Sequence, residues 1–271
     1  MSQSAPHLVE DLLEEIFLRL PTPAALARAS TACPRFRRII THGSFLRRYR
    51  KLHPPPLLGF VGESGFHPAE APHPSAPLAR ALADAADFTY SFVPEPREGH
   101  WKPIDIRDGR VLLLGSRSGY MFSLAVCDPL SRRYVLIPPM PEDLAVPEEK
   151  LLQIKSMLAP IGEDDDEMSF KVIYLAFHRS QLVAFVFSSM TGHWCISASL
   201  SWTSLGKVHP IYDMSDDCSH LHGYVYWTGL WSERDKLLVL DTRGMEFSTV
   251  NFRTGYHTQL LNRPHQPRRS P

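Results

Sequence analysis

The stretch that decides the fold is LVEDLLEEIFLRLP, residues 8–21. Its apolar residues recur at the spacing that puts side chains on one face of an α-helix, and they are Leu8, Leu12, Leu13, Ile16, Phe17 and Leu20. Carboxylates crowd the first turns, where the positive end of a helix dipole favours negative charge. Pro21 cannot continue a helix. The pattern therefore predicts an amphipathic helix that ends at Pro21.

Three more short helices are predicted to follow. Thr22 offers a capping oxygen and Pro23 occupies the first helical position of the next helix. We expect Gly43 to stop the third helix and Ser44 to cap the fourth, before the prolines at 54–56. Such short helices need tertiary packing to be stable. On this pattern alone they form a small subdomain that buries its apolar stripe on the rest of the chain.

Residues 8–40 resemble an F-box, the helical module through which a protein docks on the Skp adaptor of cullin-type ubiquitin ligases. The family pattern opens Leu-Pro-x-Glu, continues with an aliphatic pair and an isoleucine, and closes on Leu-Pro. The chain matches it at Leu8, Leu12, Leu13, Ile16, Leu20 and Pro21, with Asp11 in place of the glutamate. A later Val-Cys-Lys-x-Trp element appears as ACPRF, residues 32–36. The chain departs from the pattern at Val9 (for Pro), Pro34 (for Lys) and Phe36 (for Trp).

The resemblance implies that the helices bury an apolar face on a Skp-type adaptor and through it join a cullin ligase. The residues expected at this contact are Leu8, Asp11, Leu12, Leu13, Ile16, Phe17, Leu20, Pro21, Leu26, Phe36 and Ile39.

Length and composition favour a protein of more than one domain. The chain has 271 residues, 44% of them hydrophobic, and a formal net charge of +0, which argues against a protein that coats nucleic acid or anionic membrane. No apolar run approaches the ~20 residues of a membrane span, and residues 1–7 lack the basic start and apolar core of a signal peptide. The 4 cysteines are dispersed, which suits a reducing compartment. These features predict an intracellular protein of the nucleus, the cytoplasm or both.

The chain changes character after the helices. Proline-rich punctuation covers residues 54–77, and the alanine-rich stretch 79–86 predicts one or two helical turns. Beyond Asp87, short apolar runs alternate with turn signals, which is typical of β-strands. The predicted strands are Val111–Leu114, Met121–Cys127, Tyr134–Ile137, Phe170–Phe177, Gln181–Phe187, Tyr224–Trp227, Lys236–Leu240 and Phe247–Val250, with a further strand from Trp194.

These strands fall into three similar units, each of two strands, a turn and a further strand. The units recur at roughly 50–60 residues, a period close to that of kelch-like propeller blades. Each would be a small antiparallel sheet that buries its faces only when stacked against its neighbours. The repeat is loose, so an ordinary β-sandwich with long loops remains the alternative.

Three stretches of this region also carry a family resemblance. They are VCDPLSRRYVLIPPMP (126–141), AFVFSSMTGHW (184–194) and HGYVYWTGLW with LLVLDTRGMEFSTV (222–231 and 237–250). They resemble the F-box-associated β-propeller-like regions of plant F-box proteins, closest to the large grass families, over most of residues 57–252. Relatives continue past a third unit, whereas residues 262–271 here are polar and proline-rich. The resemblance therefore implies a shortened product with an incomplete β domain.

The predicted fold class is α+β and multidomain: a small N-terminal helical F-box followed by an all-β, propeller-like domain of the kelch or F-box-associated type. We assign residues 7–53 to the F-box, 54–87 to a Pro/Ala-rich linker, 88–258 to the β repeats and 259–271 to a disordered tail.

Residues suited to metal or covalent chemistry do not assemble a recognisable site in the sequence. Structural zinc uses Cys-x₂₋₄-Cys and His-x₃₋₅-His pairs, and neither HWC at 193–195 nor CSHLH at 218–222 contains such a pair. The acidic run 163–167 lacks the glycine and alternating ligands of a calcium loop. GSRSG at 115–119 fails the nucleophile-elbow pattern, because Ser118 has a serine, not a glycine, two residues before it. We therefore expect no catalytic residue, no metal and no cofactor.

The predicted function is that of a non-catalytic substrate-recognition subunit of a Skp–cullin–F-box ubiquitin ligase. It would hold an unknown target protein near the transfer site and so raise the effective concentration of the target lysine. Three alternatives stay open: a nucleic-acid-associated protein, a small hydrolase on a β scaffold, and a degenerate F-box protein without a target. The first would use the basic residues of the third and fourth predicted helices, which are Arg35, Arg37, Arg38, Arg47, Arg48, Arg50 and Lys51.

Overall fold

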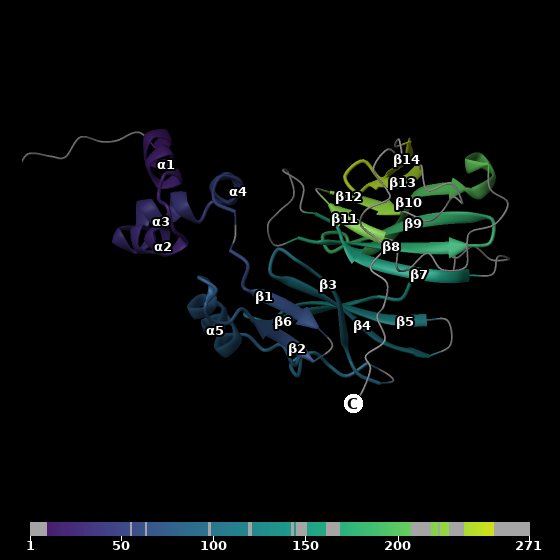
Figure 1. Ribbon diagram of the computed structural model, residues 1–271, viewed down its shortest axis with the longest axis horizontal. Coiled ribbons are helices and arrows are strands. Elements are labelled where there is room, and N and C mark those ends of the chain that lie inside the picture. Colours follow the sequence, from purple (N-terminus) through teal and green to yellow (C-terminus); the bar gives the residue numbers. More distant parts are fainter. Residues whose placement is uncertain are drawn as a thin grey trace, which may run out of the picture. The chain divides into compact units, whose positions relative to one another are not determined.

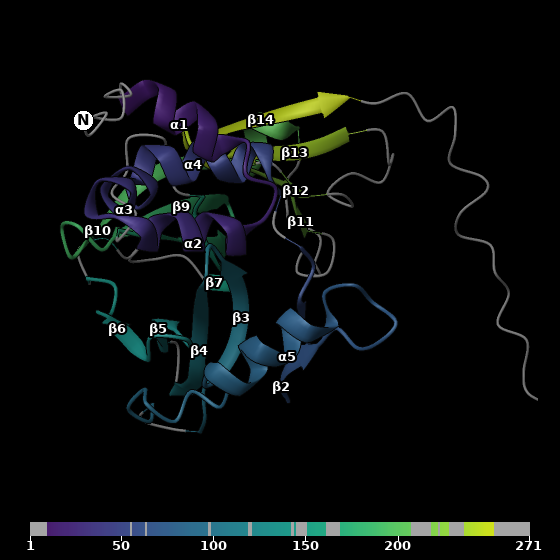
Figure 2. The same ribbon diagram turned by 90° about the vertical axis from the view of Figure 1, so that its left-hand side faces the viewer.

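The computed structural model describes residues 10–54, 56–62, 64–96, 99–118, 121–141, 144, 151–160, 169–206, 218–221, 223–227 and 236–251 (Figures 1 and 2). The chain divides into two compact units, of which the first ends at Thr89 and the second begins at Tyr90. None of the helices in the described ranges is long and apolar enough to span a membrane.

Four helices of the first unit share one hydrophobic core. They are α1 (Glu10–Leu18), α2 (Pro23–Ala32), α3 (Pro34–Ile40) and α4 (Gly43–Leu52). The core is formed by Leu13, Phe17, Leu18, Leu26, Ile39, Ile40, Phe45 and Tyr49. The start of α2 confirms the predicted cap, because the Ala25 amide donates to Thr22 Oγ1 at 3.1 Å and Pro23 is the first helical residue.

The boundary between α3 and α4 differs from the prediction. Gly43 does not stop α3 but begins α4, and Ser44 lies inside that helix. Thr41 is instead the C-cap of α3, and its amide and its hydroxyl both donate to the Arg37 carbonyl. Thr41 keeps a right-handed backbone (φ −87°, ψ 0°), so this helix end needs no glycine.

The stretch predicted as a linker contains regular structure. A hairpin joins β1 (Gly59–Gly62) to β2 (Gly65–Pro68), and α5 follows at Ala76–Ala85. The helix is longer than the one or two turns predicted at 79–86. Pro77 lies in its first turn, where a missing amide costs little.

Three four-stranded antiparallel sheets make up the second unit, each built from consecutive strands (Figure 1). The first sheet holds β3 (Lys102–Arg107), β4 (Arg110–Ser118), β5 (Met121–Asp128) and β6 (Arg133–Ile137). The second holds β7 (Leu151–Leu158), β8 (Lys171–His178), β9 (Gln181–Ser188) and β10 (His193–Ser201). The third holds β11 (Cys218–Leu221), β12 (Tyr224–Trp227), β13 (Lys236–Asp241) and β14 (Glu246–Asn251). Every strand predicted from the sequence is present, and each sheet has one more strand at its start than the predicted units had.

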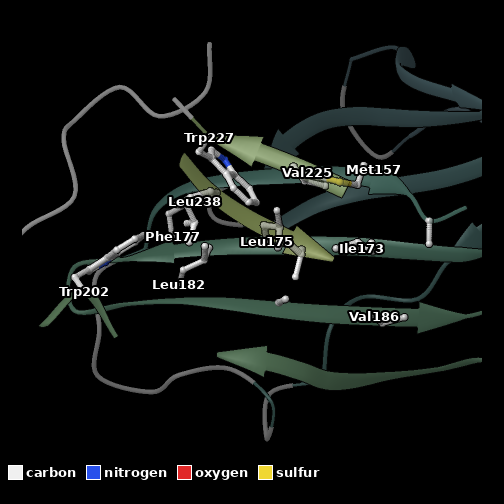
Figure 3. Close-up of a cluster of buried hydrophobic side chains, with 13 residues drawn as sticks. Met157, Ile173, Leu175, Phe177, Leu182, Val186, Trp202, Val225, Trp227 and Leu238 are labelled. Atoms are coloured by element: carbon white, nitrogen blue, oxygen red, sulfur yellow. The ribbon is translucent and has the colours of Figure 1, made fainter. Parts of the chain in front are cut away.

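The three sheets stack through two cores, one on each face of the second sheet. Side chains that alternate along β8 and β9 point to opposite cores: Val172, Val183 and Phe185 pack with the first sheet, whereas Ile173, Leu175 and Leu182 pack with the third (Figure 3). Both faces of this sheet are buried, which is why β8 and β9 read as nearly continuous apolar runs. Among the described residues the sheets form an open stack rather than a closed ring, and three layers replace the two of a sandwich.

Polar contacts also join neighbouring sheets. The Asp105 carboxylate on β3 accepts hydrogen bonds from the Leu158 amide on β7 (2.7 Å) and from the Ile106 amide (2.8 Å). The Trp194 indole on β10 donates to the carbonyl of Pro138, just after β6, at 2.8 Å. The first and second sheets are therefore joined by hydrogen bonds at both their first and their last strands.

The turn between the last two strands has the same form in all three sheets. Each closes on a paired residue, Asp128 with Arg133, Ser188 with His193 and Asp241 with Glu246. The residue before the last strand has a left-handed backbone each time, and these residues are Arg132 (φ 55°), Gly192 (φ 72°) and Met245 (φ 52°). The three units, whose sequences are only loosely similar, therefore share the same backbone turn before their last strand.

Candidate adaptor-docking surface

The apolar residues of α1 divide into a buried and an exposed set. Leu13, Phe17 and Leu18 are buried in the core of the helical module. Leu12 and Ile16 are 50% and 45% exposed. The two exposed residues lie one turn apart and therefore side by side on the helix surface. They form the centre of the candidate docking surface, which also includes the exposed Asp11 and Pro21.

This division corrects the single stripe predicted from the sequence. Four of the predicted contact residues, Leu13, Phe17, Leu26 and Ile39, lie in the module's own core. Leu20 and Phe36 are half-buried against that core, and Leu8 lies outside the described residues. Neighbouring residues of a helix point about 100° apart, so Leu12 and Leu13 face in different directions. The buried residues support the surface without being presented on it.

Aromatic packing holds α1 in place behind this surface. The Phe17 ring packs edge-to-face on Phe36, with the ring centroids 5.0 Å apart, and on Phe45 at 6.5 Å. Tyr49 donates its hydroxyl to the Leu20 carbonyl at 2.9 Å, and His53 Nε2 lies 2.7 Å from the Leu18 carbonyl. Burial raises the pKa of the Tyr49 hydroxyl, which keeps it protonated as a donor. These bonds satisfy carbonyls that the end of a helix leaves free.

Ion pairs join α1 to the two basic helices. The carboxylates of Glu14 and Glu15 flank the Arg48 guanidinium at 2.9 and 2.6 Å. Glu10 lies 2.9 Å from Arg38 and 3.9 Å from Arg35. Exposed pairs of this kind contribute little each, but they use three of the arginines that a nucleic-acid site would need. The basic cluster thus belongs to the packing of the module, which disfavours the nucleic-acid alternative.

Sequence reasoning missed Leu18 as a core residue. Leu18 lies outside the three- and four-residue spacing of the predicted stripe, and it is buried because helices pack on α1 from more than one side. No spacing signal in the sequence marks Leu18, because its burial depends on how the other helices pack on α1.

The remaining clusters carry no site in the described part of the chain. No group of three histidine, cysteine or acidic residues comes close enough there to hold a metal ion. His193 and Cys195 lie on the outermost strand β10, and Cys195 is exposed. Residues 163–167 and His222 lie outside the described residues, as do the side chains of Cys218, Ser118 and His220.

Comparison with known proteins defines the class first. Residues 6–48 match the F-box domain, so the chain is an F-box protein. Residues 103–263, more than half of the chain, match the family described as "F-box protein AT5G49610-like, beta-propeller". The chain belongs to that family. F-box domains in general bind Skp-type adaptors and act as non-catalytic substrate-adaptor subunits of cullin ubiquitin ligases.

Other comparisons add little. No curated protein matches the chain significantly. A solved oligogalacturonate lyase in complex with manganese is similar over 55% of this chain and 35% of its own, at 10% identity and a TM-score of 0.29. This chain spans only about a third of that enzyme's length, and so low a score supports no conclusion about fold or activity.

Proposed function

We propose that this protein is the substrate receptor of a Skp–cullin–F-box ubiquitin ligase, docked on the adaptor through the exposed face of α1. The observation that supports the proposal is the pair Leu12 and Ile16, two large apolar side chains that remain exposed after α2, α3 and α4 have packed on α1. Solvation of such side chains is unfavourable, and a partner that covers them gains their burial. In the cell the receptor would work in the nucleus, the cytoplasm or both.

The role of the β unit follows from this arrangement. The helical module would hold the ligase, and the three-sheet unit would hold a target protein. Neither task requires a catalytic residue, because the rate gain comes from holding the target near a ubiquitin-charged enzyme supplied by other subunits.

Replacing both exposed residues tests the docking surface. Leu12→Gln/Ile16→Gln keeps good helix formers in α1 and removes only apolar surface. Each side chain contributes about 1.5–3 kcal/mol when buried, so the pair should weaken binding of a purified Skp-type adaptor about 100-fold or more. Isothermal titration calorimetry with the full-length chain measures this loss.

Met190→Gln/Ile196→Gln is the matched control, because these residues are 68% and 51% exposed but belong to the β unit. The control should bind the adaptor as the wild type does. Wild-type affinity in the Leu12/Ile16 variant, with unchanged helix content by circular dichroism, would rule out this docking surface.

A further inference from the structure

The outer edge of β6 differs from the other sheet edges of the β unit. Among the described strands β6 is the last of its sheet and pairs with β5 alone, on one of its two edges (Figure 2). Three consecutive apolar residues on it are exposed: Tyr134 (42%), Val135 (41%) and Leu136 (49%). A strand edge that has no partner and carries an apolar surface is a template for pairing with another strand.

The two equivalent strands provide an internal comparison. β10 and β14 hold the same last position after the same kind of turn. Each carries one large exposed apolar residue, Ile196 (51%) on β10 and Val250 (46%) on β14, whereas β6 carries three in a row. Their other exposed residues are His193, Cys195, Ser199, Ser201, Glu246, Ser248, Thr249 and Asn251. Position in the repeat alone therefore does not explain the apolar residues of β6.

β6 has little of the usual protection of an edge, and Arg133 at its start is its one charged residue. Its five residues, RYVLI, contain no proline, lysine or glycine, and the two prolines come only after Ile137. Tyr134 lies opposite Cys127 and Leu136 opposite Ala125, so both extend the same face of the sheet. Val135 lies opposite Val126 on the other face. An added strand would thus meet apolar side chains on both faces.

The charges next to this edge favour one kind of partner. Arg132 and Arg133 are exposed at the start of β6, and no ion pair to either is found among the described residues. The nearby Asp128 is occupied, because its carboxylate accepts bonds from the Leu130 and Ser131 amides and from the Ser131 hydroxyl at 2.6 Å. Burial would raise the pKa of Asp128, but these bonds and the charge of Arg110 lower it overall, so Asp128 stays ionised within its own turn.

We propose that the free edge of β6 binds an extended segment of the target protein as a fifth, antiparallel strand, with apolar residues at alternate positions and acidic residues at its C-terminal end. Every described strand pair in the β unit is antiparallel, and an antiparallel partner places its C-terminus beside Arg133. Main-chain hydrogen bonds would provide affinity, and contacts with the exposed side chains of Tyr134 and Leu136 would provide specificity. The inference rests on the proposed receptor function and names the class of target that it would recognise.

The test uses the full-length chain and a terminally blocked peptide of alternating valine and threonine that ends in two glutamates. Amide shifts in the NMR spectrum should change saturably in β5 and β6. Tyr134→Ser/Leu136→Ser should weaken the peptide at least 10-fold, since it removes two exposed apolar side chains from the edge. The matched control, Ile196→Ser/Val250→Ser, removes equally exposed apolar residues from those two strands and should change affinity less than twofold. Moving the glutamates to the N-terminus should weaken binding.

Three results would overturn the inference: no saturable shifts with any peptide, equal loss in both double variants, or a concentration-dependent dimer in sedimentation that the Tyr134/Leu136 variant abolishes. The last result would show that a second copy of the chain occupies the edge. Adaptor binding by the Tyr134/Leu136 variant is measured separately and should be unchanged. If the wild type failed to bind the adaptor, the receptor function would be wrong while the peptide result would still stand.

Discussion

Arg132, Gly192 and Met245 occupy the same place in three successive turns, yet only one of them is a glycine. All three have a left-handed backbone, a conformation that crowds the Cβ atom of other residues. At Met245 the strain is offset, because the side chain packs on the core between the second and third sheets. Arg132 has no such packing, so its backbone strain is a local cost.

Exchange of the residues at this position should change stability in opposite directions. Gly192→Ala should lower the free energy of unfolding by about 1 kcal/mol, since nothing lies within 4 Å of the added Cβ and only backbone strain acts. Arg132→Gly should raise it by up to about 1 kcal/mol. Urea titration followed by tryptophan fluorescence measures both. Met190→Ala, at an exposed site in the same turn as Gly192, is the control and should change little. A change of the same sign in the free energy of unfolding for Gly192→Ala and Arg132→Gly would contradict the strain argument.

Residue positions also mark how far the sequence could predict the candidate site. The spacing of apolar residues identified α1 and the set that contains both Leu12 and Leu13, but the helix ends at Leu18, before the predicted end at Pro21. The spacing could not separate the exposed residue from the buried one, because that depends on where Phe45 and Tyr49 of α4 pack. The distribution of buried area around a helix is a tertiary property.

At the scale of elements, the first strand of each sheet is the least regular. β3 begins with Lys102 and Pro103 and contains Asp105, and β11 has only four residues. A strand paired on one side tolerates proline and polar side chains that a central strand would not. Patterns of apolar residues found the central and the last strands but missed the first strands β3, β7 and β11.

The register shift in β3 next to Asp105 has a structural role. It directs the Asp105 carboxylate toward the second sheet, where it accepts a hydrogen bond from the Leu158 amide. Asp105→Ala should lower the free energy of unfolding of the β unit by about 1–3 kcal/mol, since it leaves the amide of the buried Leu158 without its acceptor. Asp105→Asn keeps an acceptor oxygen and should cost less. Thermal unfolding of both variants provides the comparison. Stability in Asp105→Ala equal to that in Asp105→Asn would show that the bond is not needed.

The whole molecule consists of two units whose cores share no residue. The helical module has one core, and the three sheets have two of their own. The division into helical and β parts could be predicted from composition and periodicity. The stacking of the sheets could not, because it depends on contacts between residues far apart in the chain, and there the family resemblance provided the expectation.

Separate cores predict separate effects of core mutations. Leu13→Ala should destabilise the helical module by about 2–5 kcal/mol, and Ile173→Ala the β unit by a similar amount. Differential scanning calorimetry of the full chain should show each variant shifting a different transition. A single transition shifted equally by both variants would mean that the two units unfold together.

The meander connection of the strands has a consequence for how this protein is made. Every sheet is complete within one continuous stretch of chain and takes nothing from a later stretch. At synthesis rates of about 5–20 residues per second, a sheet can close within seconds of its last strand leaving the ribosome. When the strands of the third sheet emerge, the second sheet has already formed and exposes the apolar face on which the third sheet packs. Folding can thus follow the order of translation, and each completed sheet exposes an apolar face on the nascent chain until the next sheet covers it.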